Sequence, residues 1–202
     1  MNEQYYEELL NIHTVGNKSE VNHSIYYHPY EPTPYSALEE LFKHYEVSNQ
    51  DHIIDFGCGK GRLLFYLHYF YHATVTGIEM NEVFYEEAQK NKTRYEKKMK
   101  RHEDLIRFCC CKAEEYEIHP KDNRFYFFNP FSIQIFMKVI NNILRSVENN
   151  SREVDLILYY ASDDYRYFLE NQTLFQLVNE IQLPGLFEKN TYERFLIYRL
   201  TK

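Results

Sequence analysis

The sequence lacks a long apolar run. Stretches such as residues 53–56 and 156–160 are among its longest, and a membrane-spanning helix needs roughly 20 apolar residues. The first eight residues are acidic and carry no apolar segment, so they do not resemble a secretory signal. We therefore expect a cytoplasmic protein that does not cross a membrane.

Cysteine is scarce, with four residues in a chain of 202 and no Cys-x-x-Cys pair. Cys58 stands alone in a glycine-rich turn, and residues 109–111 are consecutive cysteines in an expected strand. Neighbours on a strand point to opposite faces, so these three thiols cannot surround one ion. The nine histidines are scattered rather than set at ligand spacing. The sequence therefore predicts buried, reduced thiols and no metal site.

Positive charge is also in deficit, since 23 lysines and arginines face 30 acidic residues, for a net charge of −7. This balance argues against broad electrostatic binding to nucleic acid and disfavours DNA as a partner. One segment departs from the average, because seven basic residues fall between positions 90 and 101. Such a run is typical of a solvated helix face, and it leaves RNA or an acidic protein open as a partner.

Short apolar runs alternate with longer amphipathic segments, which is typical of an α/β protein of one domain. Strands are expected at residues 52–56, 73–78, 105–111, 125–128, 154–160, 174–183 and 192–200, with helices after position 34 and over 62–71, 81–102, 132–147 and from 162. Thr33 is expected to cap the first of these helices, with Pro34 at its first position. The last two strands are close in sequence and predict an antiparallel pair. Residues 1–28 are weakly periodic and predict a peripheral arm on a domain formed by residues 29–202.

A glycine-rich turn follows the strand at residues 52–56. Asp55 precedes Gly57, Gly59 and Gly61, and a helix follows. Glycines let a ligand lie against the backbone, and a carboxylate accepts hydrogen bonds from amines and hydroxyls. Glu79 comes about 22 residues after Gly57, at the end of the next strand, where nucleotide-binding α/β folds hold the ribose. The pair predicts a nucleotide-type cofactor.

A dinucleotide is the main alternative ligand, with the fingerprint Gly-x-Gly-x-x-Gly. Here the third glycine comes one residue early, and the charge of Asp55 would oppose a phosphate, whereas it suits a sulfonium. The Walker spacing cannot be written across these residues. A purely structural glycine turn stays open.

These residues resemble the cofactor motif of the class I, seven-stranded Rossmann-like methyltransferases, and the resemblance extends over residues 30–202. It implies a three-layer α/β fold, with a mostly parallel sheet and an antiparallel C-terminal pair, and S-adenosyl-L-methionine as cofactor. The residues that it implies around the methionine part are Asp55, Gly57, Cys58, Gly59 and Gly61. It also implies that Glu79 holds the ribose and that Met80 lies beside the adenine. Lys112 and Ala113 match the family's positions at the adenine edge. Lys112 departs from the acidic residue that is common there, but the backbone amide of Ala113 can still hydrogen-bond the adenine.

The resemblance also implies an acceptor site at the end of the strand at residues 125–128. Asn129-Pro130-Phe131 is similar to the Asp/Asn-Pro-Pro-aromatic turn of amino-methyltransferases, with Asn129 accepting from the target amine and Phe131 stacking on it. The single proline puts adenine N6 in doubt as the target, and a structural turn is the alternative interpretation of Asn129. Tyr30 and Tyr35 are placed to cover the cofactor, or else to pack the following helix.

The predicted function is methyl transfer to a nitrogen or oxygen nucleophile. The alternatives are a non-catalytic S-adenosylmethionine-binding module and an NAD(P)-dependent oxidoreductase. The acceptor, whether a small molecule, protein or RNA, and the oligomeric state are not specified by the sequence.

Overall fold

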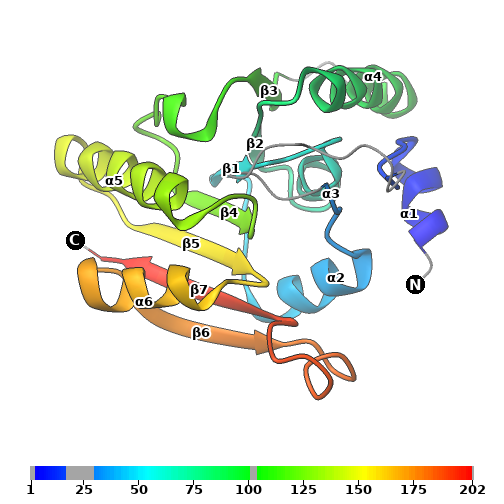
Figure 1. Ribbon diagram of the computed structural model, residues 1–202. Coiled ribbons are helices and arrows are strands. Elements are labelled where there is room, and N and C mark those ends of the chain that lie inside the picture. The colour runs from blue at the N-terminus through cyan, green and yellow to red at the C-terminus, as the bar shows by residue number, and fades with distance from the viewer. Residues whose placement is uncertain (1–2, 17–29, 101–103, 202) are drawn as a thin grey trace.

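A computed structural model describes residues 3–16, 30–100 and 104–201 of the chain. Its seven strands form one sheet in the order β3-β2-β1-β4-β5-β7-β6 (Figure 1). The strands are β1 (His52–Phe56), β2 (Thr74–Glu79), β3 (Ile106–Cys110), β4 (Arg124–Phe128), β5 (Val154–Tyr159), β6 (Gln176–Gln182) and β7 (Arg194–Leu200). β1 to β5 are parallel, and β7 is antiparallel to both β5 and β6. The predicted mostly parallel sheet with an antiparallel C-terminal pair is confirmed.

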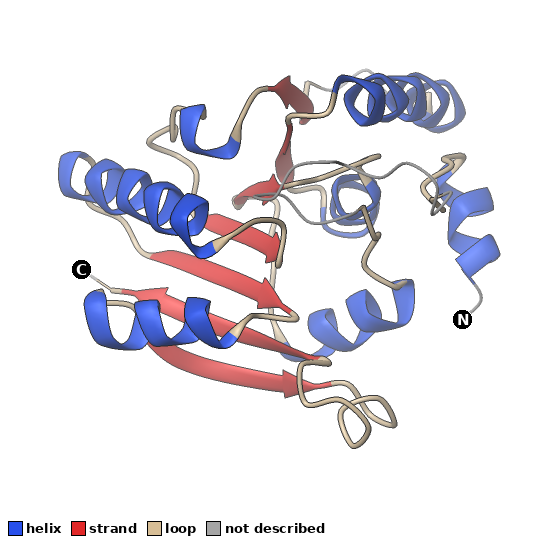
Figure 2. Ribbon diagram, viewed as in Figure 1, coloured by secondary structure: helices blue, strands red, loops and turns tan. Residues whose placement is uncertain are grey.

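Helices cover both faces of the sheet, which gives three layers (Figure 2). They are α1 (Glu3–Leu10), α2 (Tyr35–His44), α3 (Arg62–Tyr71), α4 (Glu82–Met99), α5 (Ile133–Asn149), α6 (Asp163–Gln172) and the short 3-10 helix η1 (Ala113–Glu115). Side chains alternate between the two faces of each strand. Ile53 therefore packs with α1, α2 and α3, whereas Ile54 and Phe56 pack with α5 and α6.

Most predicted boundaries agree with the structure to within two residues, and β1 and α3 match at both ends. Asn81 caps α4, because its side chain accepts from the amides of Val83 and Phe84. The prediction for Thr33 was wrong. Pro34 occupies the N-cap position of α2 without a side-chain hydrogen bond, and the Thr33 hydroxyl instead pairs with the Tyr126 hydroxyl at 2.7 Å.

The N-terminal segment contributes to the core. Tyr6, Leu10 and Ile12 are buried in the cluster that includes residues of α2 and α3, and Figure 1 shows α1 beside α3. Residues 17–29 lie outside the described part of the chain, so the predicted division between residues 28 and 29 stays a prediction.

The cysteines correct one expectation. All four are free, but only Cys58 is buried, while Cys110 is exposed and Cys109 and Cys111 are half-buried. The reason is that β3 is an edge strand, so one of its sides has no neighbouring strand. Within the described residues, no group of three or more His, Cys, Asp or Glu side chains is arranged to hold a metal ion.

The basic run lies mainly on α4. Lys90, Arg94, Lys97, Lys98 and Lys100 are exposed, and Arg101 lies outside the described residues. None of the helices in the described ranges is both long and apolar enough to span a membrane. The cytoplasmic location stays a prediction.

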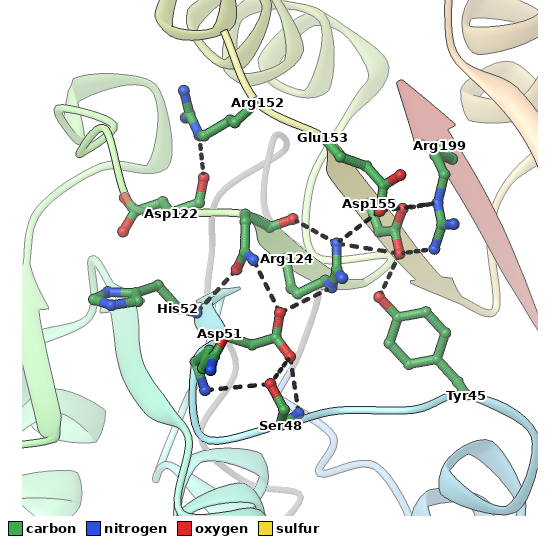
Figure 3. A network of polar contacts seen from close by, with 12 residues as sticks. Tyr45, Ser48, Asp51, His52, Asp122, Arg124, Arg152, Glu153, Asp155 and Arg199 are labelled. Carbon is green, nitrogen blue, oxygen red and sulfur yellow. Dashed lines mark hydrogen bonds and ion pairs between the residues drawn. The ribbon is translucent and has the colours of Figure 1, made fainter. Parts of the chain in front are cut away.

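A network of charged side chains joins three strands at the amino edge of the sheet (Figure 3). Asp155 is fully buried on β5, and the register places Arg124 of β4 and Arg199 of β7 opposite it. Arg199 donates from Nε and Nη2 to the two carboxylate oxygens, at 2.7 and 2.9 Å. The Tyr45 hydroxyl donates at 2.6 Å, and Arg124 Nη1 lies 3.4 Å from the same carboxylate. This network, which we call the Asp155 network, fixes the register far from the strand ends that carry the glycine turn.

Candidate functional site

The candidate site lies at the carboxyl edge of the sheet, between β1 and β4. The helix after β1 packs on one face and the helix after β4 on the other, so this is the point at which the strand order reverses and a crevice opens. The turns after the two strands touch. A Cβ atom added to Gly57 would lie 2.8 Å from Pro130 Cβ. The fold therefore brings the predicted cofactor turn against the predicted acceptor turn.

The glycine turn has a backbone that other residues rarely adopt. Gly57, Gly59 and Gly61 have φ values of +80°, +52° and +87°. A Cβ atom at Gly59 would meet the Tyr30 ring at 2.0 Å. The Tyr30 ring therefore lies directly against the Gly59 backbone, and no larger residue fits at this position.

Two carboxylates flank this turn. Glu79 accepts from the amides of Gly59 and Asn81, one on each oxygen, at 3.0 and 2.8 Å. Burial raises the pKa of Glu79, and these hydrogen bonds partly oppose the change. Burial, together with the charge of Glu79, raises the pKa of Asp55 to about 8. Two buried acidic groups at one turn favour a cationic ligand, which would relieve the repulsion between them.

Cys58 lies within the same turn and is buried. Burial raises the pKa of its thiol well above the ordinary value, and the neighbouring acidic groups add to the effect. The thiol therefore stays protonated and is a poor nucleophile. Its position is compatible with contact to a ligand and not with covalent chemistry.

The residues predicted for the adenine edge follow adjacent strands. Met80 comes after β2 and is half-buried, and Ala113 begins η1 after β3 and is buried. The two strands pair in parallel, with Glu79 opposite Cys110, so both residues lie along the same edge. The Lys112 side chain is exposed and pairs with Glu115 at 3.0 Å.

A narrow cavity of about 30 Å³ opens beside the glycine turn. Its lining includes Asp55, Gly57 and Cys58 from the turn, and Tyr30 and Thr33 from the segment that precedes α2. Six other residues line the cavity and were not predicted from the sequence, namely Glu31, Pro32, Arg62, Leu63, Tyr126 and Phe128. Only Arg62 had a usable signal, because it follows Gly61 directly.

The two predicted covering tyrosines differ in position. The Tyr30 ring lies against Gly59 and its hydroxyl donates to the Thr14 carbonyl at 2.6 Å. Tyr35 is fully buried, stacks on Tyr6 and donates to Glu7 at 3.0 Å. Tyr30 is thus at the crevice, whereas Tyr35 packs α2 against α1.

The residues of the Asn129-Pro130-Phe131 turn differ in how deeply they are buried. Asn129 is half-buried, with φ +38°, a left-handed conformation that asparagine tolerates better than most residues. Phe131 is 1% exposed and packs edge-on against Phe127 in the core. The aromatic ring at the crevice is that of Phe128, 4.5 Å from the ring of Tyr159.

The order β3-β2-β1-β4-β5-β7-β6 and the crevice between β1 and β4 define a Rossmann-like methyltransferase fold. Residues 34–120 match the model of a family described as a methyltransferase domain. The match and the fold together confirm the predicted resemblance to the class I methyltransferases.

Solved structures agree on the fold. An RNA methyltransferase from Salinibacter ruber, in complex with S-adenosyl-L-homocysteine, is 19% identical with a TM-score of 0.55, over 85% of this chain and 93% of that one. YjhP from E. coli is 12% identical with a TM-score of 0.59, over 85% and 94%. A geranyl diphosphate C-methyltransferase from Streptomyces coelicolor A3(2), in complex with Mg²⁺, geranyl diphosphate and S-adenosyl-L-homocysteine, is 10% identical with a TM-score of 0.53, over 82% and 77%. No curated protein matches the sequence significantly. The predicted cofactor, S-adenosyl-L-methionine, agrees with these findings.

Proposed function

We propose that this protein is an S-adenosylmethionine-dependent methyltransferase that acts on a nitrogen or oxygen nucleophile by in-line transfer. The observation that carries the proposal is the pair of buried carboxylates, Asp55 and Glu79, beside the glycine turn. An ammonium group and two ribose hydroxyls suit this pair, because carboxylates only accept hydrogen bonds when ionised. A pyrophosphate would add negative charge to the same place.

The residues present fit this cofactor. S-adenosylmethionine supplies a methyl group that is activated by a sulfonium. Glu79 keeps lone pairs that the amides of Gly59 and Asn81 do not use, and these can accept the ribose hydroxyls. Asp55 accepts from the amino group, and Met80 and Ala113 flank the adenine. The chain's main contribution to the reaction is then to hold the reactants in line and exclude water.

The acceptor side of the crevice is proposed at the turn after β4. Asn129 directly precedes Pro130, which lies against Gly57, and we propose that its side-chain carbonyl oxygen orients an N–H or O–H of the acceptor. Phe128 supplies the ring beside it, in the place that sequence analysis gave to Phe131. The acceptor class is a small molecule, a protein or RNA, and the RNA methyltransferase among the similar structures favours testing RNA first.

Ligand-induced stabilisation tests the cofactor class. S-adenosylhomocysteine at about 100 times its Kd is expected to add about 2.7 kcal/mol to the free energy of unfolding, which raises Tm by roughly 5–10 °C for a domain of this size. NADH at the same concentration should leave Tm unchanged. Differential scanning fluorimetry measures both, and stabilisation by NADH alone would identify an oxidoreductase instead.

Replacing Asn129 by glycine tests the acceptor site. Glycine keeps the left-handed backbone and removes the amide, so turnover should fall by about 100-fold, as for other lost transition-state hydrogen bonds. The Kd for S-adenosylhomocysteine should stay within about twofold. The assay follows labelled methyl transfer to RNA, protein and small-molecule fractions of a lysate, and then to the acceptor that it identifies.

Asn171→Ala is the matched control, because Asn171 is exposed on α6 and bonds only locally to the Tyr167 carbonyl. Full turnover in Asn129→Gly would leave Asn129 as a turn residue. No transfer to any fraction by a wild-type protein that binds S-adenosylhomocysteine would favour the non-catalytic module.

A further inference from the structure

Arg62 is a buried arginine that joins three segments around the crevice. It is the first residue of α3, directly after Gly61, and only 4% of its surface is exposed. Nη1 donates to Glu3 Oε2 at 2.6 Å and to the Thr33 carbonyl at 3.1 Å, and Nε donates to Thr14 Oγ1 at 2.7 Å. One side chain thus connects the glycine turn to the N-terminal segment and to the segment that lines the cavity.

The charge of Arg62 is matched within this cluster. Glu7 Oε1 lies 3.5 Å from Arg62 Nη2, and Glu3 is the second acidic partner. Glu7 also accepts from the amide of Thr14 at 2.6 Å and from its hydroxyl. A buried charge is tolerated when it is paired and its donors are satisfied in this way. Arg62 therefore holds protein segments together, although it lines the cavity.

The segment that Arg62 contacts, residues 30–33, forms one wall of the cavity. It is fixed at three points. The Thr33 carbonyl accepts from Arg62, the Thr33 hydroxyl pairs with Tyr126 of β4, and the Tyr30 hydroxyl donates to the Thr14 carbonyl. Two of these three contacts depend on Arg62 or on Thr14, its hydrogen-bond partner. Tyr126 is opposite Asp55 in the ladder of β1 and β4. The contact between the Thr33 and Tyr126 hydroxyls is therefore made by a neighbour of one of the two buried carboxylates.

We infer that Arg62 is a positioning residue for the cofactor crevice, and that it couples the N-terminal residues 3–14 to the wall formed by residues 30–33. The N-terminal helix α1 then helps to position the wall of the proposed cofactor site through Arg62. This inference rests on the proposed function. Lysine cannot replace arginine here, because the three donors of an ammonium sit on one atom, whereas the guanidinium donates from three nitrogens in a fixed plane.

The test combines two measurements on Arg62→Lys, with Arg145→Lys, an exposed arginine on α5, as the matched control. Hydrogen exchange at the amides of residues 30, 31 and 33, since Pro32 has none, should be faster in Arg62→Lys by about tenfold or more, which is the scale of one lost hydrogen bond. The Kd for S-adenosylhomocysteine, measured by calorimetry well below the Tm of each variant, should rise by about tenfold. Arg145→Lys should change neither quantity.

A purely structural role would lower Tm and leave the Kd of the folded protein unchanged, and that result would overturn the inference while the proposed function stands. Failure of the wild-type protein to bind S-adenosylhomocysteine would overturn the proposed function itself, and the inference with it. If Arg62→Lys does not fold, Tyr30→Phe provides the second variant. It removes only the hydrogen bond to Thr14, and it should still loosen residues 30–33 and raise the Kd.

Discussion

The substitution Asp55→Asn is expected to lower the affinity for S-adenosylmethionine by about 10- to 100-fold, the usual range for a lost charge-assisted hydrogen bond. The same substitution should make the ligand-free protein more stable. Burial of the carboxylate raises its pKa to about 8, so its ionisation in the folded state costs free energy. A gain of about 1 kcal/mol would raise Tm by roughly 2–4 °C. Calorimetric titration and a thermal melt measure the two opposite effects.

The raised pKa of Asp55 also predicts how stability and ligand affinity change with pH. A folded-state pKa above the unfolded value means that the folded protein binds the extra proton, so the contribution of Asp55 to stability falls as pH rises from about 4 to about 8. Affinity for a cationic ligand changes in the opposite sense and increases toward pH 8. The amino group of the ligand titrates in the same pH range. The affinity of Asp55→Asn should therefore keep the pH dependence that comes from this amino group and lose only the pH dependence that comes from Asp55.

Asp164→Asn is the control, because Asp164 is exposed on α6. An Asp55→Asn protein that binds S-adenosylmethionine as tightly as the wild type, with the same pH profile, would show that Asp55 does not contact the cofactor.

The second large effect is expected at the opposite edge of the sheet. Asp155→Ala should destabilise the protein by about 3–5 kcal/mol, because it removes the buried carboxylate between Arg124 and Arg199 and leaves each with a longer contact to the more exposed Glu153. Tm should then fall by roughly 6–20 °C. Urea unfolding measures the free-energy change directly. The Asp155 network in Figure 3 spans β4, β5 and β7, so the loss acts on the register of all three strands.

Cofactor affinity separates this effect from damage to the site. At a temperature well below the lowered Tm, the Kd of Asp155→Ala for S-adenosylhomocysteine should equal that of the wild type. Asp104→Ala is the control, since Asp104 forms an exposed ion pair with Arg107 and such pairs contribute about 0–1 kcal/mol. A stability loss in Asp155→Ala no larger than that of Asp104→Ala would show that the network contributes little.

The parts of the site that sequence analysis predicted are local in the chain. The strand, the glycine turn and α3 follow one another directly, so each was predicted from residues adjacent to it in the chain. Glu79 was predicted as a site residue because a parallel sheet brings successive strand ends to one edge, and its role stays a prediction.

The parts that were missed depend on contacts between distant segments. The role of Arg62 requires Glu3, Thr14 and Thr33 to meet, and no periodicity in the sequence encodes that meeting. From the sequence alone, Phe128 and Phe131 are equal candidates for the aromatic side chain beside the acceptor. The chain takes a left-handed turn at Asn129, Phe131 lies in the core, and Phe128 lies at the crevice.

The exposed Cys110 is a site at which the protein can be labelled chemically. It lies at the end of the edge strand β3, directly across the ladder from Glu79. A thiol-reactive fluorophore attached there would sit one strand away from the carboxylate that we assign to the ribose. With the half-buried Cys109 and Cys111 replaced by serine and with no tryptophan in the chain, the label would be a single optical reporter of ligand exchange in solution.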